Sequence, residues 1–389
     1  MRTVMMLKMI RYSWLVAPTL TILLGVALVG QPIVVRARKG DGGPAVKAEL
    51  NGPSSITIDP EGNLYVYEGV GLDVRRIDGR TGIITTILTG CVEPWKKPRP
   101  TGCLPPIGKI GFDPAGDLLL SEFTYNQLVK FDFSSRSLNA VAGNGDLHYS
   151  GDGGKATDAG IAVSYCFSHD GQGNLFVCDS TYRIRRMDGQ TGIIATVAGH
   201  GERGFGGDGG PALDAKFGVL VSMAVDRFGS LYVADDTSNR IRRIDSRTGV
   251  IDSFVGAAEP AKGGSTFIPF VEFSREGGPA AMARFNSPRS LIFDPNGNLV
   301  FALQGRVCKI DNLGNLKTIA GTGEDGYSGD GGAAIKARIG PNGLAMDKRG
   351  NLFIAEYESN RIRRVDAQTG VITTVAGNGL PHRPPQSIM

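Results

Sequence analysis

The chain has 389 residues, of which 41% are apolar and 21% charged, so it can bury a large core and is not a disordered segment. Its 56 glycines follow no G-X-Y period, which excludes collagen and indicates many tight turns. The formal charge of +4 falls to about +1 without the three basic residues among the first eleven, so the remainder lacks the basic surface of a nucleic-acid-binding protein.

The chain opens with a basic segment followed by a long uncharged one. After Arg11, the 24 residues from Tyr12 to Val35 carry no charge. Such a start is typical of an export signal or of an uncleaved membrane anchor, and Gly25-Val26-Ala27 would suit a cleavage site. A buried core helix is the alternative, which the basic flank disfavours. We expect a hydrophobic leader helix over residues 1–35, with everything that follows outside the cytoplasm.

Beyond the leader, one sequence unit recurs six times. In each unit a short apolar run is followed by the turn D-x-x-G-[NDS]-L, a β-rich run such as LYVAD, a basic alternating run such as IRRID, and a last run such as ITTVAG. Four short strands separated by tight turns predict one four-stranded antiparallel sheet per unit. The turns begin at Asp59, Asp113, Asp170, Asp226, Asp294 and Asp347.

Six such sheets bury both of their faces when they are arranged radially, because each then packs on two neighbours. The sequence therefore predicts an all-β fold, a six-bladed β-propeller of four-stranded antiparallel blades, over residues 36–380, with a C-terminal tail over 381–389. The ring could close in either of two ways. Each blade uses its own four strands, or IVVRAR (Ile33 to Arg38) adds an outer strand beside the last blade.

The repeated segments resemble a known family. GDGGPAxxAxL, D-x-x-GNLYVAD and NRIRRID-x-x-TGVI-x-TVAG resemble NHL repeats, in the variant found in the propellers of teneurins, and the match covers residues 40–379. Unit two lacks GDGG, and unit five has EGGPA instead. The resemblance implies the propeller fold but no single function, because proteins of this kind include adhesion and signalling domains, RNA binders and a few lyases.

Residues that occur in every unit are expected to be structural, because a functional site needs only a few blades. The turn Asp and the Asp that ends each third strand occur six times, with a basic residue two places before the latter. We expect turn caps or ion pairs between blades. An RNA surface is the alternative, which export and the low net charge disfavour. The basic residues are Arg76, Lys130, Arg186, Arg243, Lys309 and Arg364.

Two acidic patterns bear on metal binding. The GDGG loops at Gly40, Gly151, Gly207 and Gly329 could offer oxygens to Ca²⁺, but they lack closely spaced acids, so plain turns between blades are expected. The second strands end in carboxylates that could form a ring near the axis and bind a divalent cation, as in six-bladed lactonases. Alternatively, each pairs with an Arg of its own blade, such as Arg183, Arg240 or Arg361. The carboxylates are Glu68, Glu122, Asp179, Asp235 and Glu356, and Leu303 interrupts the ring.

The five cysteines of an exported chain favour disulfides. Cys91 and Cys103 bracket an irregular insertion between units one and two, and we expect them to be bonded. Cys166 and Cys178 oppose each other across a hairpin, so either a cross-strand disulfide joins them or both are small residues of the sheet. Cys308 replaces an Arg of a third strand and is expected to be a free, partly buried thiol.

Neither a zinc site nor a nucleophile is predicted. A zinc site needs three converging ligands, whereas His169 occupies an apolar position and His148, His200 and His382 fall in loops or in the tail. No GxSxG motif is present. We therefore predict no catalytic residues.

A long segment between units four and five, Gly256 to Arg275, carries Phe267, Phe270 and Phe273. On a rigid propeller these aromatic residues either bind a partner or fold down over an edge of the ring.

These patterns favour an exported propeller that serves as a rigid binding platform for an extracytoplasmic protein or glycan. We expect no nucleic-acid partner, no cofactor, and contact with a membrane only through an uncleaved leader. The alternative is a lactonase-like hydrolase or lyase that uses the acidic ring with Ca²⁺ or another divalent metal. An RNA-binding propeller is a third hypothesis, which requires cytoplasmic residence and a basic face.

Overall fold

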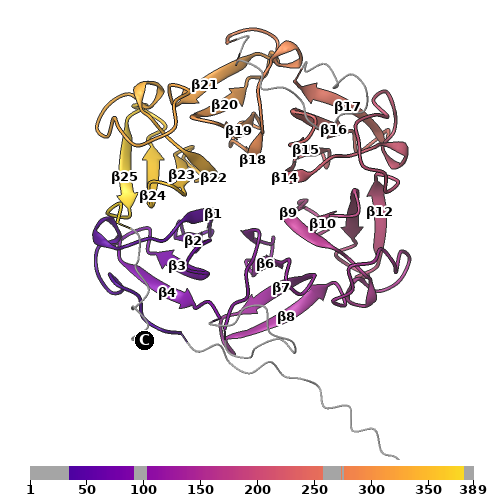
Figure 1. Cartoon of the computed structure of the whole chain (residues 1–389), viewed down its shortest axis with the longest axis horizontal. Helices are drawn as coiled ribbons and strands as arrows, with labels where there is room; N and C mark the ends of the chain where they lie inside the picture. Colours follow the sequence, from indigo (N-terminus) through magenta and orange to yellow (C-terminus); the bar gives the residue numbers. More distant parts are fainter. Residues whose placement is uncertain (1–34, 92–102, 257–272, 274–275, 381–389) are drawn as a thin grey trace, which may run out of the picture.

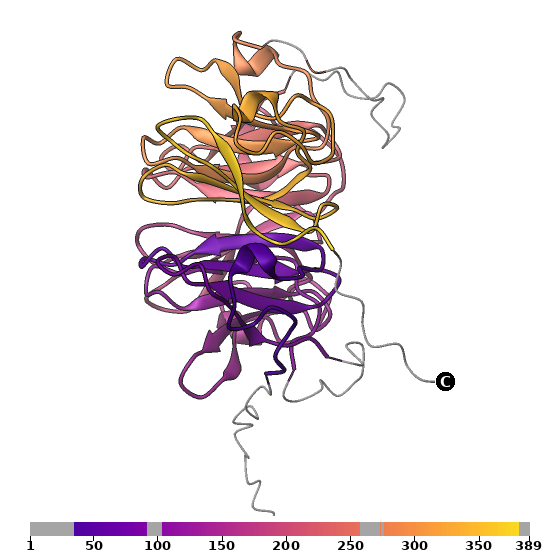
Figure 2. The same cartoon turned by 90° about the vertical axis from the view of Figure 1, so that its left-hand side faces the viewer.

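The predicted six sheets are present and surround a common axis (Figure 1). The computed structural model describes residues 35–91, 103–256, 273 and 276–380. Seen from the side, the ring is a flat disc (Figure 2). The expected leader helix lies outside the described residues, and among the described ones no helix is both long and apolar enough to span a bilayer.

Each of the first three blades is built from four consecutive antiparallel strands, counted outward from the axis. Blade 1 contains β1 (Pro53–Ile58), β2 (Leu64–Glu68), β3 (Asp73–Ile77) and β4 (Ile84–Leu88). Blade 2 contains β5 (Ile110–Phe112), β6 (Leu118–Glu122), β7 (Gln127–Asp132) and β8 (Ser137–Ala142). Blade 3 contains β9 (Val163–His169), β10 (Leu175–Asp179), β11 (Arg183–Met187) and β12 (Ile194–Ala198).

The last three blades repeat this order, and blade 4 gains a short fifth strand, β13 (Gly210–Pro211), at its outer edge. Blade 4 otherwise contains β14 (Leu220–Val225), β15 (Leu231–Asp235), β16 (Arg240–Ile244) and β17 (Val250–Val255). Blade 5 contains β18 (Arg289–Phe293), β19 (Leu299–Leu303), β20 (Arg306–Ile310) and β21 (Leu316–Ala320). Blade 6 contains β22 (Pro341–Met346), β23 (Leu352–Glu356), β24 (Arg361–Val365) and β25 (Ile372–Ala376).

The repeated Asp residues are turn caps, as predicted. Asp59 accepts hydrogen bonds from the backbone N–H of Asn63 at 2.8 Å and from its side-chain amide at 2.7 Å. The turn needs Gly62, whose φ is +90°. Asp78 likewise accepts from the N–H of Thr81 at 2.8 Å. The basic residue before it, Arg76, pairs with Asp78 within one blade, so the predicted ion pairs between blades are not formed by this residue.

The ring closes with the joint that links most neighbouring blades. In the described residues, short 3₁₀ turns precede blades 1, 3, 4, 5 and 6, and the N–H that follows an outermost strand donates to the next turn: Gly143 N–H to Ala156 O at 2.9 Å, for example. The last blade repeats this contact onto the first, from Gly377 N–H to Ala45 O at 3.0 Å. Blade 6 is thus completed by its own four strands, and Arg38 contacts Asp73 of blade 1 instead. The 3₁₀ turns are η1 (Ala45–Lys47), η2 (Ala156–Asp158), η3 (Ala212–Asp214), η4 (Ala280–Met282) and η5 (Ala334–Lys336).

Both predicted disulfides are present, Cys91–Cys103 and Cys166–Cys178. The second pair joins β9 to β10 with its Cα atoms 5.4 Å apart. Cys308 is a free, buried thiol, as expected, and burial raises its pKa to about 12. Stable disulfides are typical of proteins outside the reducing cytosol, which agrees with the expected export.

Removing the disulfide between Cys91 and Cys103 by a double Ala substitution is expected to lower the free energy of unfolding by about 3 kcal/mol. The bond closes a loop with a sequence separation of 12, and loops of this length give roughly that entropic stabilisation. Guanidinium denaturation of the two proteins under oxidising conditions measures the difference. Under reducing conditions the difference should shrink, and an equal difference in both would contradict a role for the bond.

Candidate functional site

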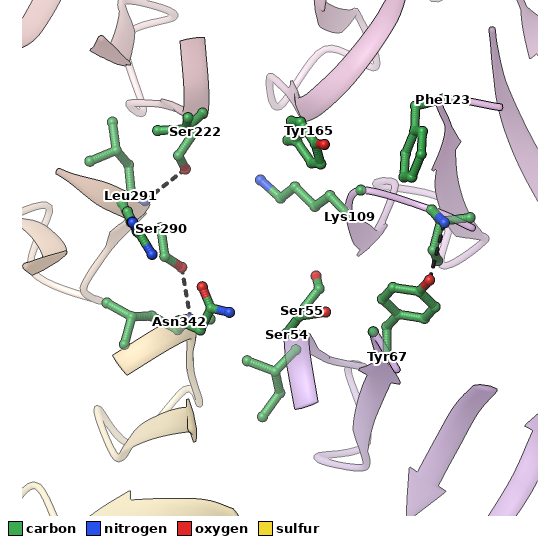
Figure 3. A pocket seen from close by; sticks show the side chains of 18 of the residues that line it. Ser54, Ser55, Tyr67, Lys109, Phe123, Tyr165, Ser222, Ser290, Leu291 and Asn342 are labelled. Atoms are coloured by element: carbon green, nitrogen blue, oxygen red, sulfur yellow. Dashed lines mark hydrogen bonds between the residues drawn. The ribbon is translucent and has the colours of Figure 1, made fainter. Parts of the chain in front are cut away.

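A pocket of about 660 Å³ lies on the propeller axis, where all six blades meet. Its walls come from the N-terminal ends of the innermost strands and from the loops that follow the second strands (Figure 3). This volume is in the range typical of small-ligand sites. Six of its lining residues bear hydroxyl groups: Ser54, Ser55, Tyr67, Tyr165, Ser222 and Ser290.

Three of these serines connect neighbouring blades across the pocket wall. The N–H of Ile110 donates to Ser55 Oγ at 3.1 Å, the N–H of Leu291 donates to Ser222 Oγ at 2.8 Å, and the N–H of Leu344 donates to Ser290 Oγ at 2.7 Å. Each hydroxyl accepts one bond from the next innermost strand and keeps its own proton to donate. The wall is therefore fixed and presents hydroxyl groups.

Tyr67, on β2, connects blade 1 to blade 2 in a similar way. Its hydroxyl accepts a hydrogen bond from the N–H of Ile107, in blade 2, at 3.2 Å. Burial raises the pKa of this phenol, so it stays neutral and remains a donor at physiological pH.

Two cations line the pocket without a carboxylate partner among the described residues. Lys109 immediately precedes β5, is half-buried, and donates from Nζ to the carbonyl oxygen of Phe167 at 3.0 Å. Burial lowers its pKa to about 8. Arg289, at the start of β18, is exposed, and its side chain forms no ion pair or hydrogen bond within the described part of the chain. Asp236 is the one carboxylate among the described residues that line the pocket, and its buried Oδ1 has no hydrogen-bond partner among them.

Two aromatic rings form one side of the pocket. Phe123 and Tyr165 have ring centroids 5.7 Å apart and planes inclined at 41°. Tyr165 is 53% exposed, although large aromatic side chains are usually well buried. Figure 3 shows both rings on the same side of the pocket as Lys109, whose side chain extends into the open space.

The pocket residues were not predicted, yet the six repeats contain a signal for them. The fifth residue before each turn Asp lines the pocket, and it is different in every blade: Ser54, Gly108, Tyr165, Val221, Arg289 and Asn342. The residue four places before the turn Asp is Ser in three blades, but it is Lys109 in blade 2. Variation at positions that symmetry makes equivalent marks residues that the fold itself does not require.

The five predicted carboxylates do not line this pocket. They are buried inside their own blades, where Glu68 lies 3.3 Å from Arg75, Asp179 lies 3.6 Å from Arg185, and Glu356 lies 3.7 Å from Arg363. Pairing within the blade is thus observed for these three, instead of convergence on the axis. The two others are Asp235, which accepts from the N–H groups of Gly218 and Ser238, and Glu122, which is buried in blade 2.

The arginines that pair with these acids are not the expected ones. Arg183, Arg240 and Arg361 stack instead on the aromatic rings of Tyr149, Phe205 and Tyr327, with the guanidinium carbon 4.0, 4.0 and 3.8 Å from the ring centroid. The acids pair with the arginine two places further on, whose side chain is fully buried. The arginine directly opposite an acid on the neighbouring strand is therefore not always the one that pairs with it.

The Asp of each GDGG loop binds the same buried arginine. Asp41 lies 2.8 Å from Arg75, and the equivalent pairs in blades 3, 4 and 6 measure 2.5, 2.5 and 2.6 Å. Units two and five lack both this Asp and the arginine, which is replaced by Val129 and Cys308. The loops are thus held to their blades by ion pairs. Among the described residues, no three His, Cys, Asp or Glu side chains gather in a way that would hold a metal ion.

The remaining predicted residues lie away from the pocket. Phe273 packs partly buried on the core between blades 4 and 5, with Arg306 4.8 Å from its ring centroid, whereas Phe267 and Phe270 lie outside the described residues. His169 lines a second cavity of about 650 Å³, at the C-terminal ends of the innermost strands and thus opposite the axial pocket. The charged residues lining that cavity are Asp59, Glu61, Asp113, Asp347, Lys348 and Arg349.

The fold defines the chain as a six-bladed β-propeller, and comparisons with known proteins add distant relatives. No family model matches the chain. Mouse teneurin-1 is 29% identical over 231 residues, which cover 53% of this chain but only 8% of teneurin-1. The chain therefore spans less than a tenth of that protein.

Two solved structures share the fold. A protein of unknown function from Bacteroides thetaiotaomicron has a TM-score of 0.59 at 16% identity, over 86% of this chain and 74% of that one. An auxiliary nutrient binding protein from the same bacterium has a TM-score of 0.57 at 15% identity, over 89% and 75%. Likeness at this level of identity establishes the architecture alone.

Proposed function

We propose that this chain is an exported, NHL-type propeller that acts as a rigid binding platform, and that its ligand, an extracytoplasmic glycan or protein segment, enters the axial pocket. The observation that carries the proposal is the contrast between repeated and unrepeated positions. Turn caps and buried ion pairs recur from blade to blade, whereas the side chains that face the pocket differ. The hydroxyl-lined wall, connected across blades by serines, supports a preformed site.

Three further observations support this function. The two disulfides suit a protein outside the cytoplasm. The repeat motifs and the distant likeness to teneurin-1 support NHL repeats as the units. One protein of the same architecture is described as nutrient binding. The lactonase-like alternative is less favoured, because three of its proposed metal ligands lie beside arginines of their own blades.

Filling the pocket is the direct test. Val221→Trp places a large side chain on the pocket wall, and Val219→Trp places the same side chain on an exposed position that does not line the pocket. The full-length chain and both variants would be applied to an array of glycans and short peptides. We expect Val219→Trp to bind the same probes as the unmodified chain, and Val221→Trp to lose about tenfold or more in affinity.

Two outcomes would contradict the proposal. One is that the unmodified chain binds no probe of the array. The other is that Val221→Trp, folded as judged by its thermal transition, binds its probes as tightly as Val219→Trp does.

A further inference from the structure

The aromatic pair at the pocket suits a ring-shaped, partly apolar ligand. Phe123 and Tyr165 come from neighbouring blades and present ring surface beside the open space (Figure 3). The C–H groups on one face of a sugar ring carry partial positive charge, and the faces of aromatic rings carry partial negative charge, so the two stack favourably. The exposed ring of Tyr165 places apolar surface in contact with water, which is unfavourable, and a stacked sugar would cover that surface.

The rest of the wall suits the hydroxyl groups of such a ring. Ser55, Ser222 and Ser290 keep a proton to donate, because each uses only its acceptor capacity in the bond between blades. Asp236 has the opposite property, since its buried Oδ1 accepts no hydrogen bond in the described structure. Because Asp236 lines the pocket, its carboxylate supplies acceptor capacity beside the serine donors.

The two cations add a preference for negative charge. Lys109 extends into the pocket from blade 2 and is half-buried without a carboxylate partner, so an anionic group of the ligand would meet it where water is partly excluded. Arg289 belongs to blade 5, is exposed, and would attract the same charge from solution. The second cavity, at the opposite ends of the innermost strands, is lined by four carboxylates and two cations, so its net charge is less favourable to an anion than that of the axial pocket.

From these contacts we infer that the axial pocket binds an acidic saccharide, with its ring on Phe123 and Tyr165 and its carboxylate on Lys109. This deepens the proposed function and rests on it. A small inorganic anion fits the site less well, because it would leave the aromatic rings of Phe123 and Tyr165 uncovered. A neutral sugar would stack but would leave Lys109 without a partner.

The test compares charged sugars with their neutral forms. The full-length chain would be applied to uronate- and sialate-bearing oligosaccharides, each placed beside the same oligosaccharide with its carboxyl group esterified. We expect acidic members to bind, and esterification to weaken binding by about tenfold to a hundredfold, as for the loss of a charge-assisted hydrogen bond. Inorganic phosphate at millimolar concentration should compete poorly.

Variants assign the charge effect to its residue. Lys109→Met should lose the same factor in affinity for the acidic form and leave binding of the ester unchanged. Lys348→Met, in the second cavity, should change neither affinity. Should Lys109→Met fold poorly, Arg289→Gln removes an exposed cation without breaking a described contact, and a two- to threefold loss at low salt is expected.

The outcomes separate this inference from the proposed function. Equal binding of acid and ester, with Val221→Trp still abolishing both, overturns the acidic saccharide while the pocket remains the site. An unchanged preference for the acid in both Lys109→Met and Arg289→Gln also overturns it. Failure of every array probe to bind overturns the proposed function itself.

Discussion

Replacing Arg363 by methionine is expected to lower the free energy of unfolding by roughly 3 to 5 kcal/mol at about pH 8. The Arg363 side chain is fully buried and lies 2.6 Å from Asp330 and 3.7 Å from Glu356. It also donates to the carbonyl oxygens of Arg338 and Ser328. Methionine fills a similar volume but leaves these acceptors without a donor, and guanidinium denaturation measures the loss.

The adjacent residue gives a matched control. Arg364 pairs with Asp366 at 2.5 Å, but both side chains are about one third exposed. Arg364→Met should therefore cost less than about 1 kcal/mol, as surface ion pairs usually do. Equal losses in the two variants would show that the buried ion pairs do not hold the blades together.

A second substitution should recover part of the loss. Blade 5 has Leu303 and Cys308 where blade 6 has Glu356 and Arg363, so the fold tolerates a blade without this ion pair. Arg363→Met combined with Glu356→Leu removes the buried acid together with its partner. We expect the double variant to be more stable than Arg363→Met alone, because a buried charge without a partner is costlier than an apolar pair.

The second large effect is a fall in stability as the pH rises from 4.5 to about 7. Burial raises the pKa of Glu68 and of Glu356 from 4.5 to about 7. Between these values the folded chain binds more protons than the unfolded chain. The stabilisation is therefore fully present below pH 4.5 and is lost as the pH rises through about 7, by roughly 3 kcal/mol for each group.

Denaturation at a series of pH values, with Glu356→Gln beside the unmodified chain, measures this effect. The amide cannot ionise, so the share of the pH dependence that Glu356 contributes should disappear in the variant, whereas the shares of Glu68, Asp179 and Asp235, whose pKa values burial also raises, should remain. The turn caps do not interfere, because hydrogen bonds lower the pKa of Asp78 and Asp245 to about 2, below the window. A variant that keeps the full slope would exclude Glu356 as its source.

Much of the fold could be predicted because its determinants are local. The D-x-x-G-N turns fix the hairpins, and counting outward from Asp170 and Asn174 pairs His169 with Leu175 and Phe167 with Val177, as observed. The partners of the buried acids are harder to predict, because a long arginine side chain can approach an acid that is not directly opposite it in the sheet. Arg183 stands directly opposite Asp179 in the sheet, so it was the expected partner, but its guanidinium stacks on Tyr149 and the diagonal Arg185 approaches the acid.

The pocket is harder to predict, because its residues come together only through the ring. Lys109 and Arg289 are 180 positions apart in the sequence and belong to blades 2 and 5. No single unit contains the site, and every blade contributes part of its wall. Aligning the six units and asking which positions vary would have identified Lys109, Tyr165 and Arg289.

The repeated joints between blades have a mechanical consequence. Gly377 binds Ala45 as Gly143 binds Ala156, so the two ends of the ring meet in the same way as blades 2 and 3 do. Between blades 1 and 2, where the described residues contain no 3₁₀ turn, the Cys91–Cys103 disulfide lies at the joint instead. A ring joined in this way restrains the width of the axial pocket, which limits the size of the molecules that can enter it.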